Sequence, residues 1–337
     1  MSDNSDHIIL SANNLNIGYT SRRKKTLVLQ GLTMDLKKGE LVCLVGHNGI
    51  GKSTLLRTLS GVQPSLGGEV KIAGKGISEM SSMEIAKTLS LVLTDRIMAG
   101  NLSVYDLVAL GRHPYTNWYG SLSEEDHQKI EEAIKLTRIE YIRNRQVHEL
   151  SDGQRQKALI ARALSQDGEI IILDEPTAHL DLNNKISVMK LLHELAEKTD
   201  KAILFATHEL EFTIQIADKL WIVGCDEPIV TGSPEDLILN KKFDMLLFEE
   251  DLIFDRMSGK FGILKAYKNE VSLSGSGEAH FWTENALKRI GIKVTTVKQN
   301  TRISVIKEGD GYLWTITKNS NVYKVDSIDK LIQRLKS

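Results

Sequence analysis

The chain has 337 residues, of which 41% are hydrophobic and 26% are charged, so it can bury a sizeable core and has room for two domains. Its formal net charge of −1 gives no reason to expect nucleic acid or an anionic membrane surface as a partner. The two cysteines, Cys43 and Cys225, exclude a disulfide framework and a zinc spacing, which is typical of a reducing cytoplasm. We expect no membrane span and no signal peptide, because no long apolar run occurs and residues 1–6 are polar and acidic.

The first elements are predicted to be strands. Residues 8–18 alternate apolar and polar side chains, which predicts an edge strand of an antiparallel sheet that leads to Tyr19. The basic run at residues 20–25 is predicted to be a solvated loop, and residues 27–36 a second strand. Residues 41–45 are wholly apolar, which indicates a buried parallel strand.

A phosphate-binding loop follows that strand directly. It has the pattern G-x-x-x-x-G-K-[ST], with Thr54 behind it, and consists of Gly46, His47, Asn48, Gly49, Ile50, Gly51, Lys52 and Ser53. Between a strand and a helix, backbone N–H groups and the positive end of the helix dipole favour an anion. Lys52 can reach the β and γ phosphates of a nucleotide, and the Ser53 hydroxyl can ligate Mg²⁺. The sequence therefore predicts a site for a nucleotide and Mg²⁺.

The middle of the chain, from residue 82 to about residue 166, is predicted to be mostly helical because apolar residues recur at intervals of three and four. Residues 111–115 interrupt that pattern. A long helix is predicted to open at Ser151, which can act as its N-cap, and to run through Leu164.

Two further strands are predicted to end in polar residues. The apolar residues 170–173 lead to Asp174 and Glu175, and residues 202–206 lead to Thr207 and His208. With a helix at residues 183–199 and a short strand pair at 219–223, this alternation predicts an α/β fold, a mostly parallel sheet with helices on both faces. Ligands of such sheets bind at the carboxyl ends of the strands. We therefore expect Lys52, the acidic pair and His208 to meet there.

These strand ends predict the chemistry of ATP hydrolysis. Asp174 would hold the Mg²⁺ shell and Glu175 would orient or deprotonate the attacking water. His208 would donate to the γ-phosphate, with a core histidine as the alternative interpretation. An isolated acidic pair would indicate a surface turn, but the strand before this pair is too apolar to lie at an edge. Phe212 stands where a zinc H-E-x-x-H site needs its second histidine, so a metalloprotease is excluded.

These residues resemble the ATP-binding-cassette ATPases over residues 8–240. Residues 150–154 are similar to the family's signature loop, with Asp152 where glycine is commoner, and residues 178–181 are similar to its D-loop. His208 corresponds to the switch histidine and Tyr19 to the aromatic residue that stacks on adenine. The resemblance implies a phosphate-loop NTPase cassette with a RecA-like core, an antiparallel β subdomain and a helical subdomain at about residues 95–165.

The resemblance also implies a homodimer of cassettes arranged head to tail. Each ATP would lie between the phosphate loop of one copy and the signature loop of the other. It places four further residues at the nucleotide: Ser151, Gly153, Gln154 and Asp181. A helix N-terminus capped by Ser151 would direct its dipole toward the γ-phosphate, in agreement with this arrangement.

Residues 104–115 are similar to the helical subdomain of cassettes that energise import of iron-siderophores, haem and cobalamin. This implies integral membrane permease subunits, indirectly a substrate-binding protein, no nucleic acid, and a peripheral location on the cytoplasmic face of the inner membrane. One departure is Thr94, followed by Asp95, where the family has a glutamine that contacts Mg²⁺ and links the site to the membrane subunit. Either a water bridges Thr94 to the ion or Asp95 substitutes. We expect altered coupling geometry rather than loss of ATPase activity.

Two domains are predicted, residues 1–254 for the ATPase and residues 255–337 for a small α+β extension. The extension holds 15 Lys and Arg residues against 8 Asp and Glu, a local charge of +7. Hairpin strands are predicted at residues 260–271 and 302–323, and amphipathic helices at 283–290 and 326–335. The charge fits a solvated face, while regulatory, dimerising and membrane-surface roles stay open.

The leading functional hypothesis is an ATPase subunit that energises an importer. The alternative is a soluble cassette ATPase in DNA repair or translation, which commonly has two cassettes in one chain or a coiled-coil insertion, and neither is seen in the sequence. A regulator that only binds nucleotide is disfavoured by intact Lys52, Asp174, Glu175 and His208. No Asn-Lys-x-Asp guanine reader occurs, so a GTPase is not expected.

Overall fold

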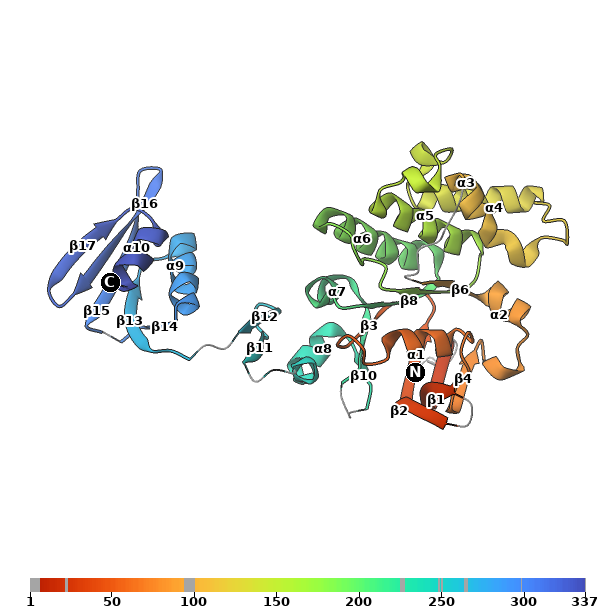
Figure 1. Cartoon of the computed structure of the whole chain (residues 1–337), viewed down its shortest axis with the longest axis horizontal. Coiled ribbons are helices and arrows are strands. Elements are labelled where there is room, and N and C mark those ends of the chain that lie inside the picture. The colour runs from red at the N-terminus through yellow and green to blue at the C-terminus, as the bar shows by residue number, and fades with distance from the viewer. Residues whose placement is uncertain are drawn as a thin grey trace. The chain divides into compact units, whose positions relative to one another are not determined.

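The computed structural model describes residues 7–21, 24–93, 101–224, 228–247, 249, 251–263, 266–297 and 299–336. The chain divides into two compact units (Figure 1). The first comprises Met1–Phe248 and Phe254–Lys260, and the second comprises Glu249–Ile253 and Phe261–Ser337. The predicted boundary after residue 254 falls within the segment where the chain passes from one unit to the other.

A six-stranded sheet with the strand order β10-β9-β3-β8-β7-β6 forms the centre of the first unit. Neighbouring strands are parallel, except that β10 runs antiparallel to β9. The strands are β3 (Leu41–Val45), β6 (Leu89–Val92), β7 (Ile170–Asp174), β8 (Ala202–Thr207), β9 (Lys219–Ile222) and β10 (Val230–Gly232). Every residue of β3, β7 and β8 is buried, as the continuous apolar runs in the sequence require when helices cover both faces.

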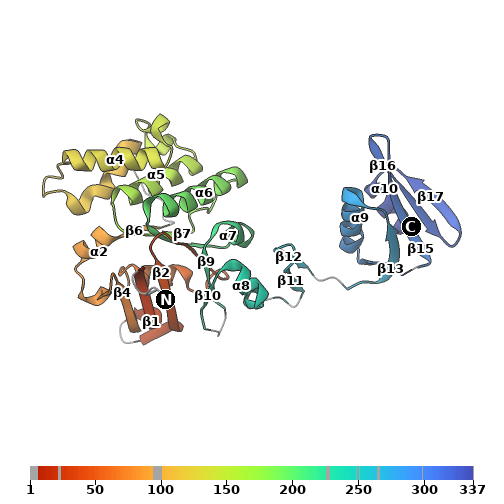
Figure 2. The ribbon, with the colours of Figure 1, turned by 180° about the vertical axis from the view of Figure 1, so that it is seen from behind.

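Helices α3 to α6 lie on one side of this sheet and α1 lies on the other (Figures 1 and 2). The bounds are α1 (Lys52–Leu59), α2 (Ser82–Thr88), α3 (Val104–Ala109), α4 (Glu124–Leu136), α5 (Asp152–Ser165), α6 (Leu182–Thr199), α7 (Leu210–Ile216) and α8 (Pro234–Leu239). Four of them begin at a serine capping box, whose hydroxyl accepts a hydrogen bond from the third helical N–H; these serines are Ser81, Ser103, Ser123 and Ser151. Local sequence therefore fixes where these helices start.

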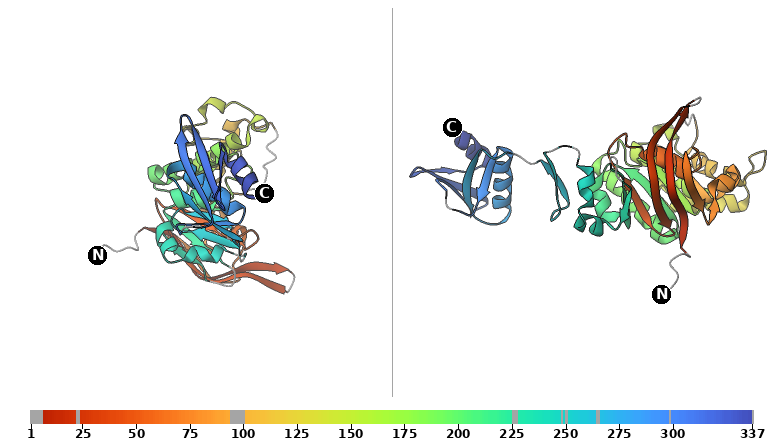
Figure 3. Two further views of the ribbon diagram at one scale, coloured as in Figure 1. Left: turned by 90° about the vertical axis from the view of Figure 1, so that its left-hand side faces the viewer. Right: turned by 90° about the horizontal axis from the view of Figure 1, so that it is seen from below.

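An antiparallel sheet with the order β2-β1-β4-β5 packs beside α1, and its long strands are red in the right panel of Figure 3. Its strands are β1 (Ile8–Ser21), β2 (Lys24–Lys37), β4 (Gly67–Ile72) and β5 (Lys75–Gly76). The prediction that residues 8–18 form an edge strand is wrong, because β1 pairs with β2 on one side and β4 on the other. The predicted loop at residues 20–25 is also wrong in part, since Thr20 pairs with Lys25 and Ser21 with Lys24. The four paired residues are exposed, so cross-strand pairing occurs here without burial.

The second unit contains a five-stranded sheet with the order β14-β13-β15-β16-β17. Its elements are β13 (Asn269–Ser274), α9 (Gly277–Arg289), β14 (Ile292–Thr295), β15 (Thr301–Glu308), β16 (Gly311–Lys318), β17 (Asn321–Val325) and α10 (Ile328–Lys336). The predicted hairpin over residues 302–323 is confirmed as β15 to β17. The predicted hairpin over residues 260–271 is wrong: β12 (Lys260–Ile263) pairs with β11 (Leu252–Asp255), and β13 joins the other sheet. Because α9 crosses over from β13 to β14, these two strands are parallel.

The core of the second unit is built from the inner face of the sheet and from both helices. Helix α9 starts earlier than predicted, because Ala279 extends the buried stripe that continues with Thr283, Ala286 and Leu287. The Trp314 indole donates a hydrogen bond to the Thr283 hydroxyl at 2.7 Å. Within the described residues, no helix combines the length and apolar character that crossing a membrane requires.

Candidate functional site

The phosphate loop joins the buried strand β3 to α1, and its glycines shape the turn. Gly49 has φ 80° and Gly51 has φ 111°, both in the left-handed region that favours glycine. A Cβ on Gly51 would lie 2.5 Å from Val28 Cγ1, so the close approach of β2 also requires glycine there. Gly51 is the N-cap of α1, with no side-chain cap, so the first N–H groups of α1 are directed toward the loop.

Lys52 is almost fully buried, with 6% of its side chain exposed. Its amine donates to the carbonyls of Gly46 at 2.8 Å and His47 at 3.2 Å, and lies 3.9 Å from the Glu175 carboxylate. Burial lowers the pKa of Lys52, and the carboxylates of Glu175 and Asp174 oppose that shift. The amine is therefore held across the mouth of the loop, where a phosphate group can replace the two carbonyls as its partner.

Asp174 and Glu175 lie at the end of β7. Asp174 is buried and pairs with Ala206 in the neighbouring strand β8. Glu175 has φ 50°, and its N–H donates to the Ala206 carbonyl at 3.0 Å. A non-glycine residue in the left-handed region is strained, and in this conformation the Glu175 carboxylate lies 3.9 Å from the Lys52 amine.

His208 follows β8, the strand that lies between β3 and β7. Its Nδ1 lies 2.8 Å from Glu175 Oε2, and its Nε2 lies 3.7 Å from Glu209 Oε1. The register pairs Val45 at the end of β3 with Thr207, and Asp174 at the end of β7 with Ala206, so the three strands end within one residue of one another. The structure thus brings together Lys52, Glu175 and His208 through contacts to one carboxylate.

Tyr19 lies beside the phosphate loop, at the end of β1. Its hydroxyl forms a hydrogen bond of 2.6 Å with the Thr54 hydroxyl in the first turn of α1. About half of the Tyr19 side chain is exposed, which leaves ring surface available for stacking. The neighbouring Ser53 is exposed, whereas Thr54 is buried.

The signature and D-loop residues lie at the starts of α5 and α6. Ser151 accepts from the Gln154 N–H, and the Gln154 side chain accepts from the Ser151 N–H at 3.1 Å. Asp181 caps α6, and its carboxylate accepts from the backbone N–H and from the side-chain amide of Asn184, each at 2.8 Å. A Cβ on Gly153 would lie 2.4 Å from the Asn184 amide oxygen, so glycine lets these two helix starts pack together.

None of the hydrogen bonds or ion pairs found among the described residues joins Ser151, Gly153, Gln154 or Asp181 to this chain's phosphate loop. Ser151 and Asp181 are exposed, Gln154 is half-buried and Gly153 is buried. The unusual Asp152 forms an ion pair with Arg155, so its charge is balanced within the signature helix.

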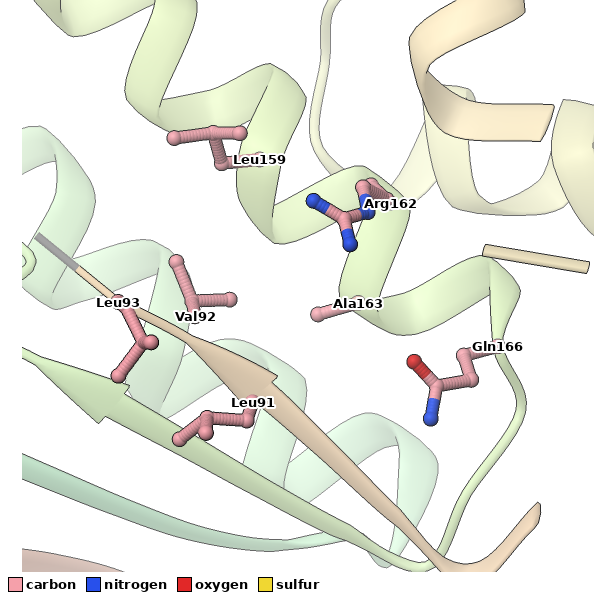
Figure 4. Close-up of a pocket in the computed structure, with 7 residues that line it drawn as sticks. All are labelled: Leu91, Val92, Leu93, Leu159, Arg162, Ala163 and Gln166. Atoms are coloured by element: carbon pink, nitrogen blue, oxygen red, sulfur yellow. The ribbon is translucent and has the colours of Figure 1, made fainter. Parts of the chain in front are cut away.

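Thr94, the predicted metal residue, lies outside the described residues. The residues that directly precede it in the sequence line a hollow of about 200 Å³ between β6 and α5 (Figure 4). It is lined by Leu91, Val92, Leu93, Leu159, Arg162, Ala163 and Gln166. Burial lowers the pKa of Arg162. The hollow thus combines apolar walls with one guanidinium, and it contains none of the residues predicted to bind nucleotide.

Two charged residues beside His208, Glu209 and Lys185, are not among the site residues that the sequence predicts. Glu209 follows His208 directly, and Lys185 of α6 forms an ion pair with it. Both are largely buried, with 16% and 24% of their side chains exposed. The place of Glu209 next to His208 in the sequence is the one feature that could have identified it as a site residue. Its pairing with Lys185 depends on how α6 packs, and the spacing of the two residues in the sequence does not predict it.

The fold and this site define a phosphate-loop ATPase, and comparisons with known proteins identify the family. Residues 29–178 match the ABC transporter family model and residues 268–336 match the iron ABC transporter C-terminal domain. The uncharacterised ABC transporter ATP-binding protein MJ0873 of Methanocaldococcus jannaschii is 38% identical over 241 residues, which cover 70% of this chain and 82% of that protein. The iron(3+)-hydroxamate import ATP-binding protein FhuC of Bacillus subtilis is 37% identical over 201 residues, covering 60% and 73%.

Among solved structures, cbiO1 of Clostridium perfringens, part of the ABC transporter complex cbiONQ, is 28% identical with a TM-score of 0.62. The match covers 72% of this chain and 96% of cbiO1. The chain belongs to the ATP-binding proteins of ABC transporters. It is an ATPase subunit of that family, as its motifs predicted, with an α/β cassette and an added C-terminal domain.

Proposed function

We propose that this chain hydrolyses ATP to drive the import of an iron(III) chelate through membrane subunits. The observation that carries the proposal is the combination of two parts in one chain. One is an ATPase site with Lys52, Glu175 and His208 in contact, and the other is a C-terminal unit that matches an iron transporter domain. The relative named for iron(3+)-hydroxamate import supports the same substrate class.

In the proposed reaction the phosphate loop binds the nucleotide, and Tyr19 stacks on the adenine. Lys52 leaves the carbonyls of Gly46 and His47 and donates to the β and γ phosphates. Glu175 accepts the proton of the attacking water or orients it, and His208 leaves Glu175 to donate to the γ-phosphate. The products are ADP and phosphate.

The donors at the site fit Mg²⁺. This ion prefers oxygen ligands and is held in nucleotide sites by one or two protein groups together with substrate phosphates and waters. Ser53, in the first turn of α1, offers a hydroxyl, and Asp174, at the end of β7, offers a buried carboxylate. When bound, the ion would neutralise the charge of the β and γ phosphates. Thr94 is proposed as a further contact through water.

We also propose that two copies of the chain form the working unit. The surface formed by Ser151, Gly153, Gln154 and Asp181 would complete the nucleotide site of a second copy. The helix dipole of α5, whose N-terminus Ser151 caps, would then act on the γ-phosphate of the second copy.

The membrane subunit is proposed to contact the hollow between β6 and α5. Its lining is apolar apart from Arg162 and Gln166, a composition that suits a protein segment with an apolar face and one acceptor for the guanidinium. Leu93, which lines the hollow, directly precedes Thr94 in the sequence, and at the position of Thr94 the family links its nucleotide site to the permease. We place the chain on the cytoplasmic face of the membrane through that contact. A role in DNA repair or translation is not favoured by these relatives.

Co-purification from native membranes tests this proposal. The tagged chain is expected to retain a multi-span membrane subunit, and Arg162→Glu is expected to lose it by reversing the charge in the hollow. Lys190→Glu, the same reversal at an exposed position of α6, is the matched control and should retain the subunit. Recovery of a wholly soluble ATPase with nucleic acid would overturn the proposal.

A further inference from the structure

The imidazole of His208 lies between two carboxylates, and only one of them is within hydrogen-bond distance. Glu175 contacts Nδ1 at 2.8 Å, whereas Glu209 stops 3.7 Å from Nε2. Donor and acceptor atoms of a hydrogen bond are normally about 3.2 Å apart or less. Because a carboxylate only accepts, Nδ1 is the donor to Glu175. When Nε2 also carries a proton, it is available to another acceptor, although a carboxylate is directly beside it.

The reason that Glu209 stops short is its partner. Its Oε1 is bound by the amine of Lys185, and this same oxygen is the one that faces His208. Its backbone N–H donates to the Thr207 hydroxyl at 3.1 Å, which fixes the start of α7. With 16% of the Glu209 side chain exposed, little water is available to replace the lysine as its partner.

Lys185 is itself held by the D-loop turn. Its N–H donates to the Asp181 carbonyl at 2.9 Å, one helical turn earlier. The Asp181 side chain in turn fixes Asn184 at the start of α6. The amine that restrains Glu209 thus belongs to a residue in the first turn of α6, a helix that Asp181 caps.

We propose that Lys185 and Glu209 are a positioning pair for His208. Lys185 binds Glu209 so that the carboxylate does not capture Nε2, and the imidazole can then move to the γ-phosphate during hydrolysis. Without the lysine, Glu209 would accept a charge-assisted hydrogen bond from Nε2 of the protonated ring while Glu175 accepts from Nδ1, and this double contact would hold the ring away from the nucleotide. Neither residue contacts the substrate. The pair concerns the hydrolysis step of the ATPase and does not depend on which substrate is transported.

Steady-state ATP hydrolysis by the full chain tests the pair. Lys185→Met is expected to lower kcat about tenfold and change KM for ATP less than about threefold, as expected for coupled neighbours that do not bind the nucleotide. Lys185→Met combined with Glu209→Gln is expected to recover most of kcat, because the capturing carboxylate is gone. Lys185→Arg, which keeps the cation, should retain activity.

The control is Lys198→Met, which removes an ion pair of 2.9 Å with Glu194 from the same helix, and it should leave kcat unchanged. If the pair only held α6 and α7 together, the double variant would be at least as impaired as Lys185→Met, and that result would overturn the proposal. An unchanged kcat in Lys185→Met would overturn it too. Should Lys185→Met fail to fold, Lys185→Gln replaces it, both alone and in combination with Glu209→Gln.

Discussion

Glu175→Gln is expected to lower ATP turnover by about a hundredfold or more, because a general base at this position contributes two to four orders of magnitude. The amide has the shape of the carboxylate but does not accept the proton of the attacking water. ATP binding should persist, since Lys52 keeps its route to the phosphates and loses a competing carboxylate 3.9 Å away. Phosphate release under saturating ATP measures the first effect, and nucleotide titration measures the second.

The same variant should accumulate a dimer when ATP is added, because a nucleotide between two copies would no longer be hydrolysed. Light scattering with and without ATP detects this. Glu169→Gln is the matched control: it makes the same change directly before β7, at a residue that pairs with Lys38 on the surface, and should behave as wild type. Turnover above about a tenth of wild type in Glu175→Gln would contradict the role of that residue.

Asp126→Asn is expected to destabilise the first unit by about 3 kcal/mol, because it leaves a charged partner buried without its counter-ion. Arg112 donates through Nε to Asp126 at 2.7 Å and through Nη1 to the Ser165 carbonyl at 2.9 Å. Only 4% and 6% of the side chains of Arg112 and Asp126 are exposed. Equilibrium unfolding in urea measures the loss.

This pair also predicts acid sensitivity. Burial alone would raise the pKa of Asp126, but hydrogen bonds from Ser123 and Arg112 outweigh it and lower the pKa from 3.8 to about 2. A carboxyl whose folded pKa is depressed stabilises the fold above its unfolded pKa and loses that contribution as the pH falls through its folded value. The difference in stability between wild type and Asp126→Asn should therefore shrink as the pH falls from about 4 toward 2.

Glu84→Gln provides the control, because Glu84 occupies the same capping-box position in α2, where it is exposed and binds Lys75 on the surface. A much smaller loss is expected there. Equal losses in Glu84→Gln and Asp126→Asn would show that the cap, rather than the buried ion pair, carries the effect.

Much of the fold was predictable because local sequence and burial agree. The apolar runs of β3, β7 and β8 correspond to strands that are buried throughout. The serine capping boxes mark the starts of α4 and α5. Because parallel strands end at one edge of their sheet, the meeting of Lys52, Glu175 and His208 followed from the order of motifs.

The errors arose where pairing partners distant in sequence decide the structure. Alternation shows that residues 8–18 form a strand, but not that β2 and β4 occupy both of its sides. Similarly, residues 260–271 contain two strands that belong to different sheets, and α9 determines the parallel pairing of β13. The ion pair of Lys185 with Glu209 joins residues 24 positions apart, and no spacing rule predicts it.

Uptake of radioactive iron(III) as a hydroxamate chelate, in cells that lack their own copy of this chain, tests the central claim most directly. The wild-type chain is expected to restore accumulation, and Glu175→Gln is expected to restore none while still joining the membrane complex. Restoration by Glu175→Gln to the wild-type level would contradict the account, because import would then not depend on hydrolysis at the site formed by Lys52, Glu175 and His208.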